Sequence, residues 1–164
     1  MPQFTKLIIL TFFIFLNHCI IAQIDSIFIY CDENDFNTMY TNYSDDSYID
    51  CVLKYEGGKY NSKIRIRGSS SRKFSKKSLK IKYKTTDGNE SLNLNADYLD
   101  ESYMHQYLSS QLYKMMGQPV FSCNHRALFL NDEFLGIYLN VENVNTELLL
   151  KHKLSAQGNL YKAS

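Results

Sequence analysis

The sequence predicts an α+β domain, an antiparallel sheet with one long helix, and three observations support this class. The chain has 164 residues, 45% of them hydrophobic and 21% charged, which suits one folded core and excludes a disordered chain. Residues 63–67 and 78–83 alternate apolar and polar side chains, the pattern of strands. Between Ser102 and Gly117, apolar residues recur at steps of three and four, which predicts a helix.

The first 22 residues are interpreted as a signal peptide. Lys6 precedes an apolar run, residues 7–16, which has the length of a secretory core and is too short for the roughly 20 residues of a spanning helix. Cys19 supports an alternative, a lipid anchor, because part of a bacterial lipoprotein motif precedes it. We therefore expect a secreted or cell-envelope protein without a stable membrane span, whose folded domain covers residues 23–164.

Three cysteines follow the signal peptide, Cys31, Cys51 and Cys123. In an oxidising compartment this odd number allows one internal disulfide, and Cys31 with Cys51 is the preferred pair. Since the chain has no CxxC motif, and no histidine stands at ligand spacing to a cysteine or to another histidine, we expect no metal site.

Charge is unevenly distributed along the chain, although its formal net value is only +1. Residues 25–56 hold eight acidic residues and one lysine, whereas residues 59–84 hold eleven basic residues and no acidic one. The two alternating segments lie in the basic stretch, so each predicted strand places its cations on one face. This face could be a solvated surface or a binding surface. Neither an RNP-like nor a helix-turn-helix motif is present, so we expect no nucleic-acid partner.

A polar loop, residues 68–77, connects the two basic strands. It contains a glycine, several hydroxyl side chains and the adjacent pair Lys76 and Lys77, and its backbone amides could form an anion-binding nest. Phosphate is the expected ligand. The loop is not a Walker A motif, because the pattern GxxxxGK[ST] is absent.

Turn residues and apolar spacing predict the remaining elements. The predicted helix is capped by Asp100 or Ser102, ends at Gly117, and turns a mainly apolar stripe toward the core. The acidic segments 32–35 and 45–46 are interpreted as surface loops that bind no calcium, because the EF-hand pattern fails there. The other predicted elements are a hairpin turn at 57–58, a turn at 87–89, a strand at 92–95, a hairpin of 126–130 with 136–141, and a short helix at 145–153.

This order of elements is that of the N-lobe of a protein kinase. The sequence motifs are more specific than this order, because they resemble those of one family. Residues 67–72 read RGSSSR and residues 76–83 read KKSLKIKY, which resembles the RGxSSR…KKSxxxK signature of the CotH (spore coat protein H) kinase family. Residues 94–100, the hairpin FLNDEFLGIY at 129–138, and GNLYK at 158–162 resemble further segments of that family in the same order. The resemblance covers about residues 64–163.

The resemblance implies a secreted or spore-associated atypical protein kinase that transfers the γ-phosphate of ATP to serines of a partner protein, with Mg²⁺ or Mn²⁺ as the divalent metal. Either Lys77 or Lys80 would pair with the phosphates. Their spacing leaves both open, since Lys77 lies in the loop and Lys80 on the strand that follows it. Carried over by position, the ATP-binding residues are Arg67, Ser69, Ser70, Arg72, Lys76, Lys77, Lys80 and Glu142.

The second lobe of such a kinase, which would carry the catalytic and metal-binding aspartates, is absent from this chain, so we assign it no catalytic and no metal residue. Two interpretations remain open. In the first, the chain is the N-terminal, nucleotide-binding part of a longer kinase and is inactive alone. In the second, it is a truncated, secreted binding or scaffold module that recognises an anion through its basic loop.

Overall fold

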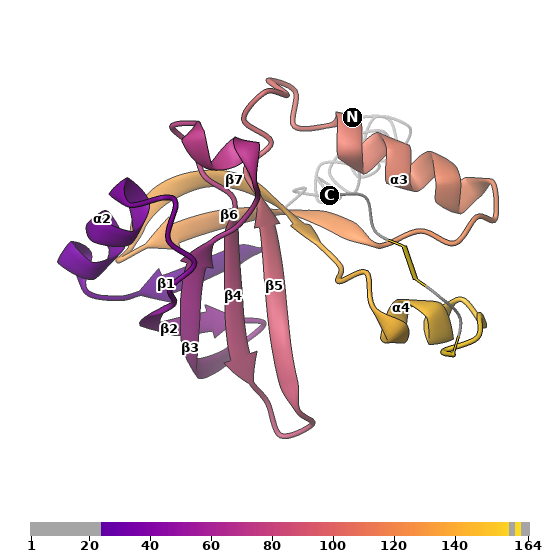
Figure 1. The fold of residues 1–164 in the computed structure, drawn as a ribbon, viewed down its shortest axis with the longest axis horizontal. Coiled ribbons are helices and arrows are strands. Elements are labelled where there is room, and N and C mark those ends of the chain that lie inside the picture. The colour runs from indigo at the N-terminus through magenta and orange to yellow at the C-terminus, as the bar shows by residue number, and fades with distance from the viewer. Residues whose placement is uncertain (1–23, 158–159, 162–164) are drawn as a thin grey trace, which may run out of the picture.

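The computed structural model describes residues 24–157 and 160–161, and its main feature is a seven-stranded mixed sheet closed into a barrel (Figure 1). Neighbouring strands follow the order β1-β2-β3-β4-β5-β7-β6, and β1 closes the barrel by pairing with β6 in parallel. The other pairings are antiparallel. The strands are β1 (Ser26–Tyr30), β2 (Ile49–Tyr55), β3 (Gly58–Ile66), β4 (Leu79–Lys84), β5 (Asn89–Asn95), β6 (Cys123–Leu130) and β7 (Glu133–Val141).

The prediction of an α+β domain with an antiparallel sheet and one long helix, resembling a kinase N-lobe, is therefore wrong. The helices of the described chain are short: α2 (Glu33–Thr41), α3 (His105–Met115), α4 (Thr146–Lys151) and a 3-10 turn, η1 (Ser70–Lys73). Helix α3 begins later than predicted because Tyr103 has a φ of 56°, outside the helical region. The Asp100 carboxylate still accepts a hydrogen bond from the His105 amide at 2.8 Å.

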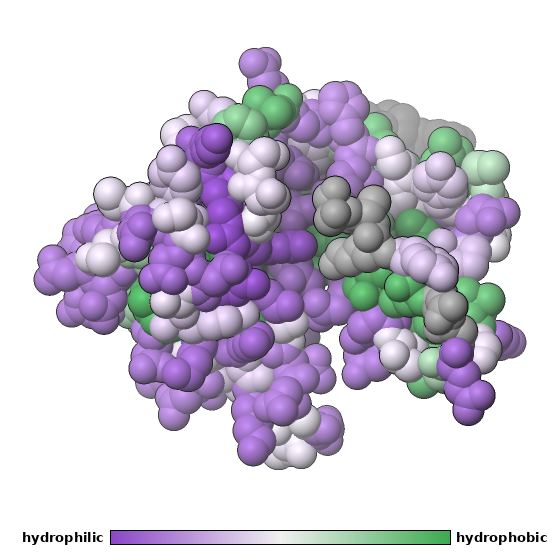
Figure 2. All heavy atoms as spheres, in the orientation of Figure 1, coloured by the Kyte–Doolittle hydropathy of each residue, from purple (hydrophilic) through white to green (hydrophobic). Residues whose placement is uncertain are grey.

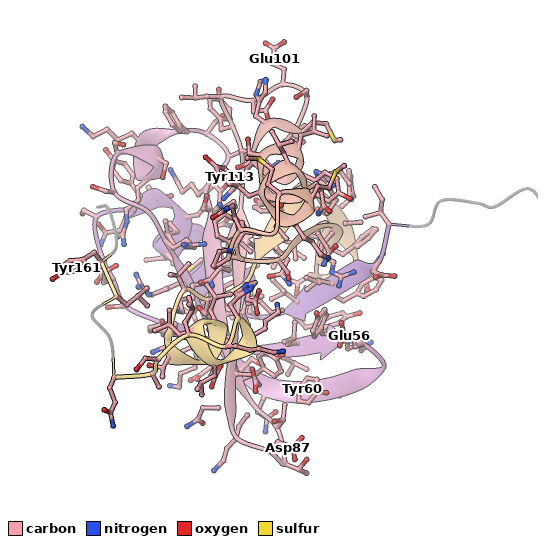
Figure 3. The ribbon with its side chains drawn as sticks, turned by 90° about the vertical axis from the view of Figure 1, so that its right-hand side faces the viewer. Glu56, Tyr60, Asp87, Glu101, Tyr113 and Tyr161 are labelled. Carbon is pink, nitrogen blue, oxygen red and sulfur yellow. The ribbon has the colours of Figure 1, made fainter. Side chains whose placement is uncertain are left out.

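The apolar stripe of α3 is exposed, which corrects the prediction that it faces the core. Leu108 is 54% exposed, Leu112 58% and Met115 85%. The strands already fill the barrel, so α3 packs beside the sheet, and Ser110 is its one buried residue. Hydrophobic atoms accordingly gather at the surface on the side that carries α3 and α4 (Figure 2). Tyr113 of α3 lies on this side (Figure 3).

Helix α2 replaces the loop that was predicted at residues 32–35. Asp32 caps it, because its carboxylate accepts hydrogen bonds from the backbone amides of Asn34 and Asp35. Phe36 and Met39 are buried in the barrel core, which explains why this polar segment becomes helical. The segment at 45–46 is a loop, as predicted.

The predicted basic strands and hairpins are confirmed. Strands β3 and β4 pair so that Lys63 lies opposite Lys82 and Arg65 opposite Lys80. The turn between β6 and β7 uses Asn131 and Asp132, with φ values of 48° and 68°, the left-handed conformation that such turns require. Asn145 caps α4 by accepting a hydrogen bond from the Leu148 amide. The interior is aliphatic, since Ile27, Ile64, Leu79, Ile81 and Leu94 are all 0% exposed.

The outer face of β3 and β4 therefore carries the cations, while the inner face holds the core. The predicted signal peptide and Cys19 lie outside the described residues. Within residues 24–157 and 160–161, no helix is long and apolar enough to cross a membrane. Of the GNLYK motif at 158–162, Leu160 and Tyr161 are described, and neither is in a strand.

Candidate functional site

A polar groove of about 710 Å³ lies on the outer face of β3, β4 and β5. Its volume is within the usual range for sites that bind small molecules. The strands form one wall, and the segment that leads from β7 to α4 forms the other. The groove brings together four of the residues predicted from the sequence, namely Arg67, Arg72, Lys80 and Glu142.

The wall built by the strands concentrates like charges. Arg65 and Lys80 are direct cross-strand neighbours, an arrangement that destabilises a sheet unless the charges are compensated. Arg65 is compensated by an ion pair with Asp46, and Lys63 by an ion pair with Asp50 at 3.2 Å. The backbone of Lys80 belongs to the sheet, but its side-chain ammonium forms neither a hydrogen bond nor an ion pair with another described residue.

Arg67 is the second cation of the groove without a carboxylate partner among the described residues. Its guanidinium donates a hydrogen bond to Asn95 Oδ1 at 2.8 Å, and Asn95 in turn donates to Gln106 of α3 at 2.8 Å. This relay through two neutral amides fixes the orientation of Arg67 without neutralising it. Arg67 and Lys80 are therefore the two cations of the groove that form no ion pair within the described residues, and the carboxylates of Glu90 and Glu147 line the same groove.

The electrostatic environment of these two side chains favours an anion. Burial lowers the pKa of Lys80, and the neighbouring Arg67, Lys82 and Arg65 lower it further, against an opposing effect of Tyr48. Burial also lowers the pKa of Arg67, with a further contribution from Arg65. Both shifts mean that the folded chain disfavours these charges until an anion binds beside them.

Arg72, by contrast, has its guanidinium fully engaged within the protein. Its Nε donates to the Gly68 carbonyl at 2.6 Å, its Nη1 contacts the Tyr43 carbonyl at 3.2 Å, and its Nη2 is ion-paired with Asp46. The side chain thus ties the loop at residues 68–77 to the loop that follows α2. Arg72 borders the groove but offers it no free charge.

The two adjacent lysines of the loop are also engaged. Lys77 is 5% exposed, and its Nζ donates to the carbonyls of Arg72 and Phe74 at 2.6 and 2.9 Å. Lys76 Nζ donates to the carbonyls of Ala96 and Ile137 at 3.0 and 2.5 Å. Neither lysine lines the groove, and of the two residues left open for phosphate contact, Lys80 is the one that faces it.

Ser69 and Ser70 are exposed at the start of η1 and do not line the groove. Gly68, which precedes them, has a φ of 104°, and a Cβ on it would lie 2.3 Å from Ser71 Oγ. The positive φ favours glycine at this position of the motif, and a larger residue would also displace the Ser71 hydroxyl. The loop is a compact, internally bonded turn.

Glu142 lies on the opposite wall and is ion-paired. Both of its carboxylate oxygens accept hydrogen bonds from Lys151 Nζ at 2.8 Å, and Oε2 also accepts from the Ser122 amide at 2.8 Å. Although burial alone would raise it, these hydrogen bonds hold the pKa of Glu142 below its usual value. Glu142 therefore fastens α4 to the start of β6.

Arg65, Asn93 and Asn95 also line the groove, and they were not among the residues predicted from the sequence. Arg65 stands two residues before Arg67 on the same strand face, so the alternation that identified the strand could have identified it. The two asparagines had no such signal, because they come from β5 and reach the groove only through the pairing of strands.

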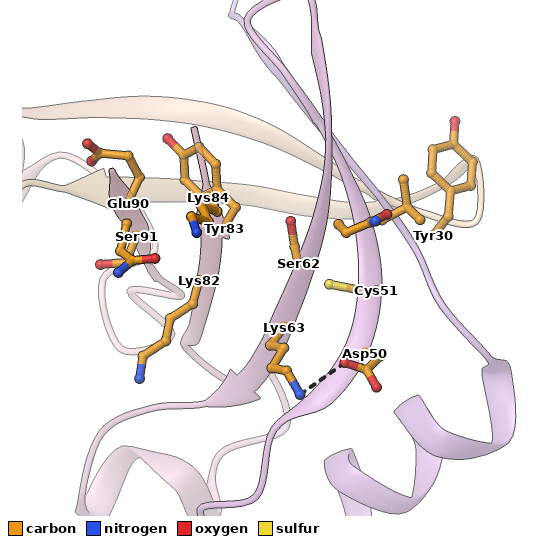
Figure 4. A pocket seen from close by; sticks show the side chains of 13 residues that line it. Tyr30, Asp50, Cys51, Ser62, Lys63, Lys82, Tyr83, Lys84, Glu90 and Ser91 are labelled. Atoms are coloured by element: carbon orange, nitrogen blue, oxygen red, sulfur yellow. Dashed lines mark ion pairs between the residues drawn. The ribbon is translucent and has the colours of Figure 1, made fainter. Parts of the chain in front are cut away.

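A larger pocket, of about 920 Å³, lies along β2 to β5 (Figure 4). Three lysines line this pocket, Lys63, Lys82 and Lys84, and Lys63 is ion-paired with Asp50, as the dashed contact in Figure 4 shows. We place the candidate site in the smaller groove, because four of the residues predicted from the sequence line that groove and none of them lines the larger pocket. Within the described residues, no group of three or more His, Cys, Asp or Glu side chains could hold a metal ion.

Comparison with known proteins adds an independent result. A family model described as CotH kinase protein matches residues 64–164. Inner spore coat protein H of Bacillus subtilis (strain 168) is 33% identical to this chain over 122 residues, which are 73% of this chain and 33% of that protein. The chain therefore spans about a third of the length of this curated relative.

Proposed function

Because this chain belongs to the CotH kinase protein family, we propose that its groove binds the phosphates of ATP in a protein kinase that phosphorylates serine. The kinase would transfer the γ-phosphate to serine hydroxyls of a partner protein. The observation that carries this proposal is the pair of cations without an ion pair among the described residues, Arg67 and Lys80, on one wall of the groove.

Phosphoryl transfer relies on positioning and on stabilisation of negative charge, which is what these side chains supply. Lys80 provides a compact positive charge for phosphate oxygens. Arg67 provides a planar donor group whose orientation is set in advance by Asn95. Binding a phosphate here would also relieve the repulsion between Arg65 and Lys80 across the two strands.

Other predicted residues receive supporting roles in this proposal. Arg72, Lys76 and Lys77 hold the loop in place, so that Arg67, just before the loop, and Lys80, just after it, reach the groove together. Glu142 shapes the opposite wall through Lys151. The same contacts give no support to the loop itself as an anion-binding site, since its three engaged cations already bind backbone carbonyls.

The complete reaction needs more than these residues. Mg²⁺ or Mn²⁺ would reduce the charge on the phosphates, and we assign it no ligand here, because no group of three or more His, Cys, Asp or Glu side chains among the described residues could hold a metal ion. Kinase activity, a serine-bearing protein substrate, and secretion through a signal peptide or a lipid anchor at Cys19 are therefore proposals for the whole protein.

A titration of the chain with ATP tests the proposal. We expect Lys80→Met to weaken ATP binding about tenfold, the loss of one charge-assisted contact of about 1.4 kcal/mol. The matched control is Lys63→Met, which removes a cation from the same pair of strands, but one that Asp50 compensates, and it should change the affinity less than about twofold. Equal affinities for the wild-type chain and Lys80→Met would overturn the assignment.

A second experiment tests the reaction. The complete protein, incubated with ATP labelled at the γ-phosphate and a serine-containing protein, should yield labelled phosphoserine. Lys80→Met should reduce this labelling. Binding of ATP without any transfer of label would reject the kinase activity while leaving the nucleotide site in place.

A further inference from the structure

Two cysteines lie opposite each other on neighbouring strands, away from the groove. Tyr30 of β1 pairs with Val52 of β2 in antiparallel register, so the next residue on each strand places Cys31 opposite Cys51. Opposite residues of antiparallel strands point to the same face. Here that face is the barrel interior, where Cys51 belongs to the core and Cys31 packs against it.

The hydrogen bonds of the Cys31 backbone identify which type of cross-strand pair this is. The Cys31 amide donates to Asn131 Oδ1 and the Cys31 carbonyl accepts from Asn131 Nδ2, both at 3.1 Å. The backbone of Cys31 therefore points away from β2, which makes Cys31 and Cys51 a non-hydrogen-bonded pair. Cα atoms of such pairs lie about 4.5 Å apart, within the range that a disulfide spans.

We propose that Cys31 and Cys51 form a cross-strand disulfide when the chain meets a small-molecule disulfide such as oxidised glutathione. The Cys31 thiolate attacks the small disulfide, forms a mixed disulfide and releases one thiol. The Cys51 thiolate then attacks the Cys31 sulfur and releases the second thiol. Two protein thiols are oxidised, one small disulfide is reduced, and the two protein protons pass to the two released thiolates.

The surroundings of the two thiols set this order of attack. Cys31 is the more exposed of the two, whereas Cys51 is 7% exposed and lines the pocket seen in Figure 4. Burial, together with Cys31 and Asp50, raises the pKa of Cys51 to about 12, and burial with Asp32 and Asp35 also raises the pKa of Cys31. Cys51 is therefore a poor first nucleophile, but its position opposite Cys31 suits it to the intramolecular second step.

The disulfide would close the chain segment that contains α2 and the loop after it. That loop carries Asp46, the one carboxylate among the described residues that is ion-paired with both Arg65 and Arg72 beside the groove. Oxidation would therefore restrict the movement of the loop that carries Asp46, and it would leave Arg67 and Lys80 unmodified. The inference does not depend on whether the groove binds ATP.

The third described cysteine provides a matched control. Cys123 belongs to a separate, smaller core cluster, and its sulfur contacts the Ser110 hydroxyl at 3.0 Å. We expect Cys123→Ser to leave the disulfide unchanged and Cys31→Ser to abolish it. Cys31 is the better position to replace, because its partial exposure makes a folding defect smaller than at Cys51.

The experiment equilibrates the folded chain with reduced and oxidised glutathione, blocks the remaining thiols and maps the peptides by mass spectrometry. We expect a peptide pair that links Cys31 to Cys51 in the wild-type chain and in Cys123→Ser. We also expect the melting temperature of the wild-type chain, but not of Cys31→Ser, to rise by roughly 5–10 °C on oxidation. Free Cys31 and Cys51 after full equilibration, or a linkage of either residue to Cys19 or Cys123, would overturn the proposal.

Discussion

Two groups of cations lie within fifteen residues of each other in this chain, and they differ in what they contact. Arg72, Lys76 and Lys77, in the loop at residues 68–77, direct their side chains to backbone carbonyls. Arg67 and Lys80, at the strand ends on either side of that loop, face the groove without a carboxylate partner among the described residues.

The difference shows that a dense run of positive charge does not by itself define an anion site. A cation that already binds carbonyl groups must lose those bonds before it can bind phosphate, which offsets the gain. A half-buried cation without an ion-pair partner can bind an anion without first breaking other contacts, and the anion stabilises its charged form. The two groups should therefore respond in opposite ways to substitution, the loop group in stability and the strand group in affinity.

The largest expected effect is on stability, at Lys77. In Lys77→Met, two partly buried carbonyls lose their donor, and we expect the free energy of unfolding to fall by about 2–3 kcal/mol. The ATP affinity of the folded variant should stay within about twofold of wild type. Chemical denaturation and an ATP titration measure the two quantities. Lys73→Met, an exposed position in the same loop, is the control, and an equal loss of stability there would refute the structural role of Lys77.

A smaller loss of stability is expected when the loop backbone is altered. Gly68→Ala forces a side chain onto a φ of 104° and against Ser71 Oγ, and it should lower the free energy of unfolding by about 1–2 kcal/mol. Gly117 has a φ of 71°, but no atom lies close to an added Cβ, so Gly117→Ala should lower the free energy of unfolding less. Combining Gly68→Ala with Ser71→Gly should restore part of the loss, and no recovery would mean that the contact with Ser71 is unimportant.

The strand group should show its effect in affinity. Arg67→Lys keeps the positive charge but loses the planar donor group that Asn95 orients, so we expect ATP binding to weaken about fivefold. Lys80→Arg keeps the positive charge at this position and should change the ATP affinity less than about threefold. Stability should change little in either variant. Equal effects of the two exchanges in the ATP titration would show that only charge matters at Arg67.

The smallest expected effect concerns Asp46 and depends on pH. A hydrogen bond from Arg72 and the charges of Arg65 and Arg72 outweigh its slight burial and hold the pKa of Asp46 below its usual value. A lowered pKa in the folded chain means that the stabilisation is present above the unfolded pKa, about 3.9, and is lost as the pH falls through the folded value.

Asp46→Asn should therefore be slightly less stable than wild type near pH 6, and the difference should shrink below about pH 4. Urea denaturation at several pH values measures it. Asp87→Asn, in the exposed turn between β4 and β5, serves as the control. A difference that grows toward acidic pH would contradict the assigned ion pairs.

Local patterns predicted the parts of the fold that depend on neighbouring residues. Alternation identified the basic strands, and turn residues such as Asn131 identified the hairpins. The barrel itself was missed, because the parallel pairing of β1 with β6 joins residues about 100 positions apart, which no local pattern encodes. The stripe of α3 was misassigned for a related reason, since an apolar helix face has the same sequence whether or not a partner covers it.

The candidate site was predicted in part. Arg67, Arg72, Lys80 and Glu142 were named from their motifs and do border one groove. That Lys77 is buried and bound to backbone carbonyls was not predictable, because its partners depend on how the loop folds back on itself. The contribution of Asn95 depends on strand pairing in the same way.

The most direct test of the contrast between the two groups is a chemical footprint of the unmodified chain. Brief acetylation, read out by mass spectrometry with and without tripolyphosphate, reports the reactivity of each lysine. We predict that Lys80 reacts freely and is protected at least about fivefold by tripolyphosphate, whereas buried Lys77 reacts slowly in both conditions. Protection of Lys77 with no protection of Lys80 would contradict the account, because it would place the phosphate in the loop.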